Sequence, residues 1–402
     1  MMRYPLGADS GLKVFLVFAA LLFLVSPFLV STLFLAAMAV LSSMGRSSNC
    51  QIRINWLAFG VAVLVSSWFI GSKSLAPSLG NDRAMYLDYV YLFRGGGFYQ
   101  LMSYHPEWVS FGALWLISML VDGKGIFWLF YIVVMAAVGL AFRGNVRFLP
   151  LFFLLLMSSS VFLNLYGNLV RQSLASAFVL GALTASKKRV AGIVVLGVFS
   201  HLSVFLAAPA MLLSRKINFN FFTSVLLVFI GFSCSSLLGY MVDFLASSGS
   251  VLASKVSFYQ DFESSDSDQS GLTFGLMLTI LFLVKLIKDR TNIIGRGDAD
   301  MFERLFSFLV LMSFVLALMT GMGKVFERVF VYYYVVFVFF AVFCVYGIAS
   351  ERVRIVAVAS LVFILCFSVI IRLGGGGYYP GAQYEYAQSN FLSMFVEWLG
   401  WM

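Results

Sequence analysis

Residues 164–183 read NLYGNLVRQSLASAFVLGAL, and this stretch indicates what kind of fold the chain forms. Its second half is apolar enough for a membrane span, yet Arg171 and Gln172 lie where that span begins. On one continuous helix both residues share a face with Asn164 and Asn168, because positions i, i+4, i+7 and i+8 lie on one side. Ionisable groups are costly inside a membrane and usually serve a function there. The stretch therefore predicts a membrane helix whose polar stripe opens at one end of the span.

The composition of the whole chain supports the same fold class. The chain has 402 residues, of which 61% are hydrophobic and only 11% are charged. A soluble domain of this size needs more polar surface. We therefore predict an all-α polytopic integral membrane protein that forms a single transmembrane domain over 1–402. The apolar segments predict about 11–13 transmembrane helices, since each crossing takes about 20 residues.

Basic clusters predict which loops face the cytoplasm, because Lys and Arg are enriched there. The clusters contain Arg46, Arg53, Arg143, Arg147, Lys187, Lys188, Arg189, Lys285, Lys288, Arg290, Arg296, Arg352 and Arg354. They explain the net charge of +9, so nucleic acid is not an expected partner. Three segments then face outward: loop 78–124, which we expect to hold a re-entrant helix, the acidic loop 247–270 and the C-terminal tail 372–402.

The sidedness of these loops is consistent only if some apolar segments fail to cross. Segment 107–121 is short for a crossing, so we expect a re-entrant or interfacial helix on the outer side. Between Arg189 and the acidic loop, either 190–213 is broken around His201 or 219–246 is broken within GFSCSSLLG. Irregular backbone at membrane depth is tolerated only inside protein or along a cavity. One or two broken or re-entrant helices therefore predict an outward-facing cavity.

Other polar residues also lie within apolar segments. The stretch GKVFERVFVYYY places Arg328 and Tyr332 on one helical face, and GVFSHLSVFLAAPA contains His201. Each has a structural alternative. Arg328 could pair with Glu327 at a helix start, His201 could be a hydrogen-bonded packing residue, and Arg171 could extend to lipid headgroups.

Two carboxylates are candidates for acid–base chemistry. Asp82 lies in GNDRAMY, and Glu107 lies in HPEW directly before an apolar segment. A transfer to a hydroxyl group needs a base, for which a carboxylate is the usual choice. The four cysteines show no metal-binding spacing, and the glycine run at 374–377 lacks the features of a phosphate loop. We therefore expect no metal and no cofactor.

Five stretches together carry a resemblance to a known family. They are GNDRAMY (80–86), PEWVSFGALWLI (106–117), NLVRQSLASAFVLGAL (168–183), FSHLSVFLAAPAMLL (199–213) and ERVFVYYY (327–334). In this order they resemble the bacterial O-antigen and exopolysaccharide polymerase family of the Wzy/EpsG type, over roughly residues 55–345. The family usually shows His-Lys-Ser, whereas this chain has His201-Leu202-Ser203, so it carries no charge at the middle position.

The resemblance implies a glycosyltransferase in the inner (cytoplasmic) membrane of a bacterium, with its active site facing the periplasm. Such a polymerase transfers a growing glycan from undecaprenyl diphosphate to the terminal sugar of another lipid-linked repeat unit, as in lipopolysaccharide or exopolysaccharide biosynthesis. It needs neither a metal nor a nucleotide sugar. The implied partners are the undecaprenyl-diphosphate-linked oligosaccharide, membrane lipid and, as a candidate, a chain-length regulator protein.

Within that reaction, each candidate residue receives an expected role. Developing charge on the diphosphate leaving group needs fixed cations, and Arg171 and Arg328 are the candidates. The residues expected to support them by hydrogen bonding are Gln172, Tyr332 and Asn168. The expected base for the acceptor hydroxyl is Glu107 or Asp82, with His201 as a third candidate.

Two other functions remain as alternatives. An O-antigen ligase would use the same donor but a different acceptor, and we would expect a larger late outer loop than 247–270. A flippase for lipid-linked oligosaccharides would show paired repeats and polar residues along the whole path. Here the polar residues gather toward the outer half, which favours chemistry there.

Overall fold

The computed structural model describes residues 22–24, 26–44, 49–72, 75, 82–104, 106–247, 267–291 and 299–374, and positions 392, 394, 396 and 399. The elements in these residues are helical, which confirms the predicted all-α class. They are α2 (Pro27–Ser43), α3 (Asn49–Ser72), α4 (Arg83–Tyr104), α5 (Trp108–Ser118), α6 (Lys124–Ala141), η1 (Val146–Phe148), α7 (Leu149–Met157), α8 (Ser160–Gly167), α9 (Val170–Thr184), α10 (Lys187–Ser200), α11 (Val204–Leu213), α12 (Phe221–Ser247), α14 (Ser267–Arg290), α15 (Ala299–Leu318), α16 (Gly323–Tyr346) and α17 (Glu351–Gly374).

Several of these helices have the length and composition of membrane spans. In the described part of the chain, five are long and apolar enough to cross, by length and composition alone: α3, α6, the 271–290 part of α14, α15, and the 325–346 part of α16. The protein is therefore a polytopic membrane protein, as predicted. The expected number of about 11–13 spans would require the shorter helices to join into further crossings.

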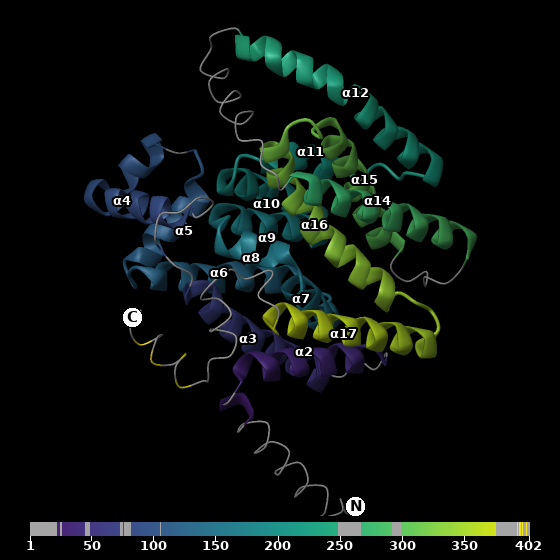
Figure 1. Cartoon of the computed structure of the whole chain (residues 1–402), viewed down its shortest axis with the longest axis horizontal. Helices are drawn as coiled ribbons and strands as arrows, with labels where there is room; N and C mark the ends of the chain where they lie inside the picture. Colours follow the sequence, from purple (N-terminus) through teal and green to yellow (C-terminus); the bar gives the residue numbers. More distant parts are fainter. Residues whose placement is uncertain are drawn as a thin grey trace, which may run out of the picture.

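Helix α9 lies in the middle of the molecule, beside α8, α10 and α16, whereas α12 lies at an edge (Figure 1). Small side chains let helices approach α9 closely, and Ala175, Ala182 and Ser176 are buried on it. The Ser173 hydroxyl donates to the Val170 carbonyl of the same helix at 2.6 Å, so a polar group is satisfied without an outside partner. The sequence of α9 thus suits a central helix.

The stretch 164–183 does not form the one continuous helix that we predicted. Helix α8 ends at Gly167, and α9 begins at Val170. The backbone N–H groups of Asn168 and Leu169 both donate to the Asn164 carbonyl, at 3.0 and 2.9 Å, which closes the end of α8. The polar residues of this stretch therefore lie on two helix ends and the turn between them.

The predicted break around His201 is confirmed, and the alternative break in 219–246 is not found. Helix α10 ends at Ser200 and α11 begins at Val204, whereas α12 runs continuously from Phe221 to Ser247. His201 itself has extended backbone angles (φ −158°, ψ 126°). The apolar stretch 146–167 is also divided, into η1, α7 and α8. Ser158 follows the last residue of α7 as its C-cap, and Ser159 caps α8 by accepting from the Phe162 N–H at 3.3 Å.

The first part of the expected outer loop 78–124 is largely helical, since residues 83–104 form α4. Gly97 interrupts this helix with a φ of 70°, a conformation that glycine adopts without strain. Helix α5 follows and has 11 residues, a length of about 17 Å, which is short of a bilayer core of about 30 Å. It therefore has the length expected for a re-entrant helix.

Candidate functional site

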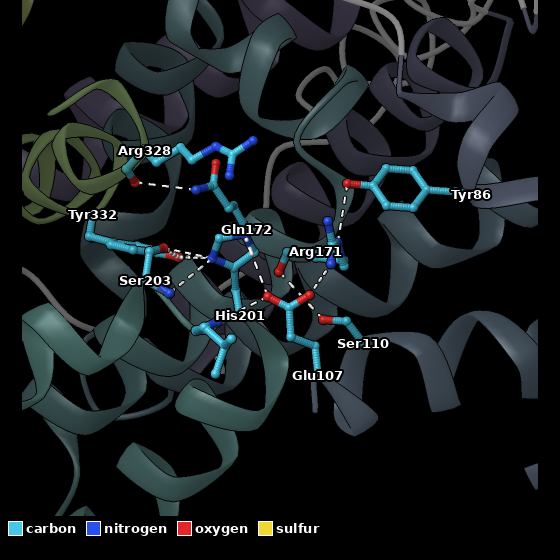
Figure 2. A network of polar contacts seen from close by, with 10 residues as sticks. Tyr86, Glu107, Ser110, Arg171, Gln172, His201, Ser203, Arg328 and Tyr332 are labelled. Atoms are coloured by element: carbon cyan, nitrogen blue, oxygen red, sulfur yellow. Dashed lines mark hydrogen bonds and ion pairs between the residues drawn. The ribbon is translucent and has the colours of Figure 1, made fainter. Parts of the chain in front are cut away.

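Five parts of the fold bring polar side chains together at one place (Figure 2). Tyr86 comes from α4, Glu107 from the residue before α5, Arg171 from the first turn of α9, His201 from the break between α10 and α11, and Tyr332 from α16. Four of these side chains were expected in the site from the sequence, namely Glu107, Arg171, His201 and Tyr332, and Tyr86 of the GNDRAMY stretch joins them. Helix ends and breaks supply most of this site, as the prediction of a cavity at irregular backbone requires.

The centre of the site is an ion pair between the Arg171 guanidinium and the Glu107 carboxylate. Nη1 of Arg171 donates to Oε2 of Glu107, while Nε of Arg171 lies 3.3 Å from the Tyr86 hydroxyl. The guanidinium also lies over the rings of Tyr86 and Phe111, with centroid distances of 5.3 and 5.0 Å. These contacts hold the plane of the guanidinium in one orientation.

Glu107 is buried, with 5% of its surface exposed, and both carboxylate oxygens are engaged. Its second oxygen, Oε1, accepts a hydrogen bond from the backbone N–H of Leu202 at 3.0 Å. The same oxygen lies 3.7 Å from Nε2 of His201. The carboxylate therefore connects the first turn of α9 to the break between α10 and α11.

A second chain of contacts leads from His201 to α16. Nδ1 of His201 lies 2.6 Å from the Ser203 hydroxyl, which lies 2.9 Å from the Tyr332 hydroxyl. The backbone N–H of Ser203 donates to Nδ1 at 3.2 Å. Since an N–H can only donate, Nδ1 must accept, and the proton of a neutral imidazole lies on Nε2. His201 therefore turns a donor toward Glu107.

Gln172 lies between Arg328 and the Arg171–Glu107 pair (Figure 2). Nε2 of Gln172 donates to the backbone carbonyl of Arg328 at 3.4 Å. Gln172 is buried with 2% exposure, whereas Arg328 is half-buried. The site thus contains two arginines, one from α9 and one from α16.

The remaining expected residues occupy the edge of the site. Asp82 is half-buried directly before α4, and within the described residues no side-chain hydrogen bond joins it to Glu107 or Arg171. Asn168 lies in the turn before α9, where its Nδ2 donates to Oδ1 of Asn164 at 3.1 Å. A carboxylate role for Asp82 and a binding role for Asn168 stay predictions.

One arginine of the GNDRAMY stretch, for which we expected no role, is bound to backbone carbonyls. Arg83 is fully buried and donates to the carbonyl oxygens of Gly167 (2.8 Å), Ile70 (2.5 Å) and Gly71 (3.4 Å). Its guanidinium also lies over the Phe127 ring, 4.8 Å from the centroid. Arg83 thereby ties the start of α4 to the ends of α3 and α8, whose last carbonyls lack helical partners.

Two serine residues, Ser110 and Ser203, belong to the site although we did not predict a role for them. The Ser110 hydroxyl of α5 donates to the Arg171 carbonyl at 3.4 Å, and Ser203 links His201 to Tyr332. The position of Ser203 two residues after the histidine was a signal in the sequence. Ser110 gave none, because serine is common in apolar helices, where it bonds to its own backbone.

Within the part of the chain that the structure describes, no group of three or more His, Cys, Asp or Glu side chains lies close enough to hold a metal ion. The fold and the site together define a multi-pass helical membrane protein with a buried polar centre where its helices break. The chain belongs to the EpsG family, whose family model matches residues 56–384. That family is of the exopolysaccharide and O-antigen polymerase type, so the resemblance in the sequence is confirmed. No curated protein and no solved structure matches the chain.

Proposed function

We propose that the protein is a polysaccharide polymerase of the bacterial inner membrane that works at the periplasmic face. It would transfer a growing glycan from undecaprenyl diphosphate to the terminal sugar of another lipid-linked repeat unit. Membership of the EpsG family supports this activity. The observation that carries the proposal is the buried Glu107–Arg171 pair, joined to His201 at a broken helix.

The reaction replaces one bond at the anomeric carbon of the donor sugar by another. The bond to the diphosphate oxygen breaks, and the lipid diphosphate leaves with the electron pair. The hydroxyl oxygen of the acceptor sugar forms the new glycosidic bond, and its proton passes to a base. The protein must therefore stabilise negative charge on the leaving group and accept one proton.

Arg171 is well placed to bind the diphosphate. It lies in the first turn of α9, where the helix dipole adds to its positive charge and anions are favoured. Its contacts with Glu107 and Tyr86 use Nη1 and Nε, so in the described structure Nη2 remains for a phosphate oxygen. Arg328 would supply the second cation, because it comes from α16 on the opposite side of Gln172.

Glu107 is the base that the geometry favours. It is a carboxylate next to the expected position of the leaving group. The Leu202 N–H orients it by donating to Oε1, which also faces Nε2 of His201 at 3.7 Å. Diphosphate binding at Arg171 would compete with Glu107 for the guanidinium, which would free Oε2 to accept the hydroxyl proton. Asp82 and His201 are the other candidates, and substitution separates the three.

The test uses the purified protein in detergent with a lipid diphosphate-linked repeat unit and no nucleotide sugar. Products are separated by gel electrophoresis and mass spectrometry. A ladder spaced by one repeat unit would support the polymerase, and a Glu107→Gln variant should give no ladder. Substrate that binds without being extended would contradict the proposal. Transfer to a lipid A core acceptor would then indicate a ligase, and movement across vesicles would indicate a flippase.

A further inference from the structure

The amide group of Gln172 has a definite orientation in the site. Its NH2 group donates to the Arg328 carbonyl at 3.4 Å, and a carbonyl oxygen can only accept. The amide oxygen, Oε1, therefore points away from the backbone of α16. Only 2% of the residue is exposed, and among the described residues Oε1 has no hydrogen-bond partner. Buried polar atoms without a partner are rare in proteins and call for an explanation.

The hydrogen-bonding role of Oε1 decides which ligand group it can bind. An amide oxygen accepts hydrogen bonds and cannot donate them. The oxygens of an ionised diphosphate are also acceptors, so they would repel Oε1 rather than bind it. The free oxygen therefore cannot serve the role in diphosphate binding that we predicted for Gln172, which would fall to the second N–H of the amide. The groups that fit are donors, and a carbohydrate offers them as hydroxyl and acetamido N–H groups.

The position of Gln172 agrees with a carbohydrate ligand. It follows Arg171 directly on α9, and Figure 2 shows its side chain between Arg328 and the Arg171–Glu107 pair. A lipid diphosphate held by the two arginines would place its first sugar beside this amide.

We propose that Oε1 of Gln172 accepts a hydrogen bond from a hydroxyl or acetamido N–H of the sugar attached to the diphosphate. Gln172 is thereby a specificity-determining residue that binds the sugar, while Arg171 and Arg328 bind the phosphates. This assignment rests on the proposed function, because it needs a sugar diphosphate at the two arginines. Sites built to hydrogen-bond a substrate group discriminate strongly against ligands that lack it.

The experiment compares two ligands by equilibrium binding. One is the lipid-linked oligosaccharide extracted from cells in which this gene is deleted, and the other is the same lipid diphosphate after removal of its sugars. The variant is Gln172→Met, which keeps the size of the side chain and removes the acceptor. The matched control is Ser173→Ala, since Ser173 is equally buried on α9 and its hydroxyl bonds to its own helix. Size-exclusion chromatography checks that each variant is folded.

We expect Gln172→Met to weaken binding of the lipid-linked oligosaccharide by about 3- to 10-fold, the effect of one hydrogen bond. Binding of the sugar-free lipid diphosphate should change less than about twofold, because Gln172 does not contact the phosphates. Ser173→Ala should leave both affinities unchanged.

Equal weakening for both ligands, or no weakening for either, would overturn the assignment. If Gln172→Met does not fold, the two affinities of the unmodified protein still test the assignment. The assignment is wrong if the unmodified protein binds the sugar-free lipid diphosphate as tightly as the lipid-linked oligosaccharide. Failure of the proposed function looks different. In that case the ladder is absent although the oligosaccharide binds, or neither lipid binds at all.

Discussion

Glu107 forms an ion pair with Arg171, which lies 64 positions further along the chain. Both groups are largely buried, with 7% and 17% of their side chains exposed. Inside a membrane protein such a pair is more favourable than either charge alone, and removal of one partner leaves the other uncompensated. We therefore expect the pair to act both in the fold and in the proposed reaction, and substitution can separate the two effects.

The first prediction concerns Arg171. Arg171→Gln should lower chain growth by on the order of 10²–10³-fold, the usual effect of losing one group that stabilises developing charge. Arg171→Lys should restore only part of the activity, because the ammonium keeps the charge but lacks the planar fork. The amount of polymer formed per minute by the purified protein measures both effects.

Stability provides the control for this prediction. Arg171→Gln alone leaves the Glu107 carboxylate unpaired and should destabilise the fold by about 3–5 kcal/mol. The double variant Arg171→Gln/Glu107→Gln should recover most of that stability in thermal unfolding and stay inactive. A double variant that polymerises at the normal rate would refute the role of both residues.

The second prediction is that Arg83 acts on folding and not on chemistry. Arg83→Lys keeps the charge but cannot donate to the carbonyls of Gly167, Ile70 and Gly71 together, since these lie at the ends of two different helices. We expect a loss of about 3 kcal/mol or more in unfolding free energy, because buried carbonyls lose charge-assisted hydrogen bonds. Thermal unfolding should show this loss.

The residual activity of Arg83→Lys distinguishes it from Arg171→Lys. At a temperature where the variant is still folded, its activity per folded molecule should be close to normal. A folded Arg83→Lys protein without activity would instead place Arg83 in the reaction.

Arg171 was predicted as a site residue from the sequence, whereas the contacts of Arg83 were not. Residue type and placement predicted that Glu107, Arg171, His201 and Tyr332 belong to one site, and the structure brings them together. Polar groups in apolar segments are few, so they must gather in a shared protected place. The all-α membrane fold was predictable from local hydropathy, whereas the break at His201 was one of two alternatives that the sidedness of the basic loops required.

What the sequence could not predict depends on contacts between distant helix ends. Arg83 bonds to carbonyls 12 to 84 positions away, and nothing in the local pattern shows which helix ends come near it. The apolar segments 148–165 and 169–185 are separate in the sequence, but the period of the polar residues continues through the break after Gly167, so the shared polar face was wrong. The unpaired atom of Gln172 is its amide oxygen only because the amide NH2 group donates to the Arg328 carbonyl, 156 positions away.

The third prediction separates two roles for His201. Nε2–H of His201 faces Oε1 of Glu107 at 3.7 Å, and if this contact positions Glu107 in the reaction, His201→Gln can supply a similar amide donor. We expect this variant to lose less than about tenfold in rate, whereas His201→Phe, which has no donor, should lose more. A histidine that acts as the general base would show losses on the order of 10²–10⁴-fold in both variants. Initial rates at saturating substrate measure the difference.

The fourth prediction fixes the side of the membrane on which the site lies. Helix α9 begins at the site and ends near the exposed residues Lys187, Lys188 and Arg189, so these mark the opposite face. Basic residues favour the cytoplasmic side, so we expect the site and the exposed turn at Gly321 on the outer side. A cysteine side chain fits at 321, because a Cβ there would meet no atom within 4 Å.

The measurement uses a background in which the native cysteines are replaced by alanine, namely Cys50, Cys234, Cys344 and Cys366. Single substitutions Gly321→Cys and Lys188→Cys are then treated in intact spheroplasts with a maleimide that does not cross membranes. We expect label on 321 and none on 188 until the membrane is opened. The reverse pattern would place the Glu107–Arg171 pair on the cytoplasmic side, where a polymerase acting on exported repeat units could not work. The sidedness of these two positions therefore tests the proposed function without measuring catalysis.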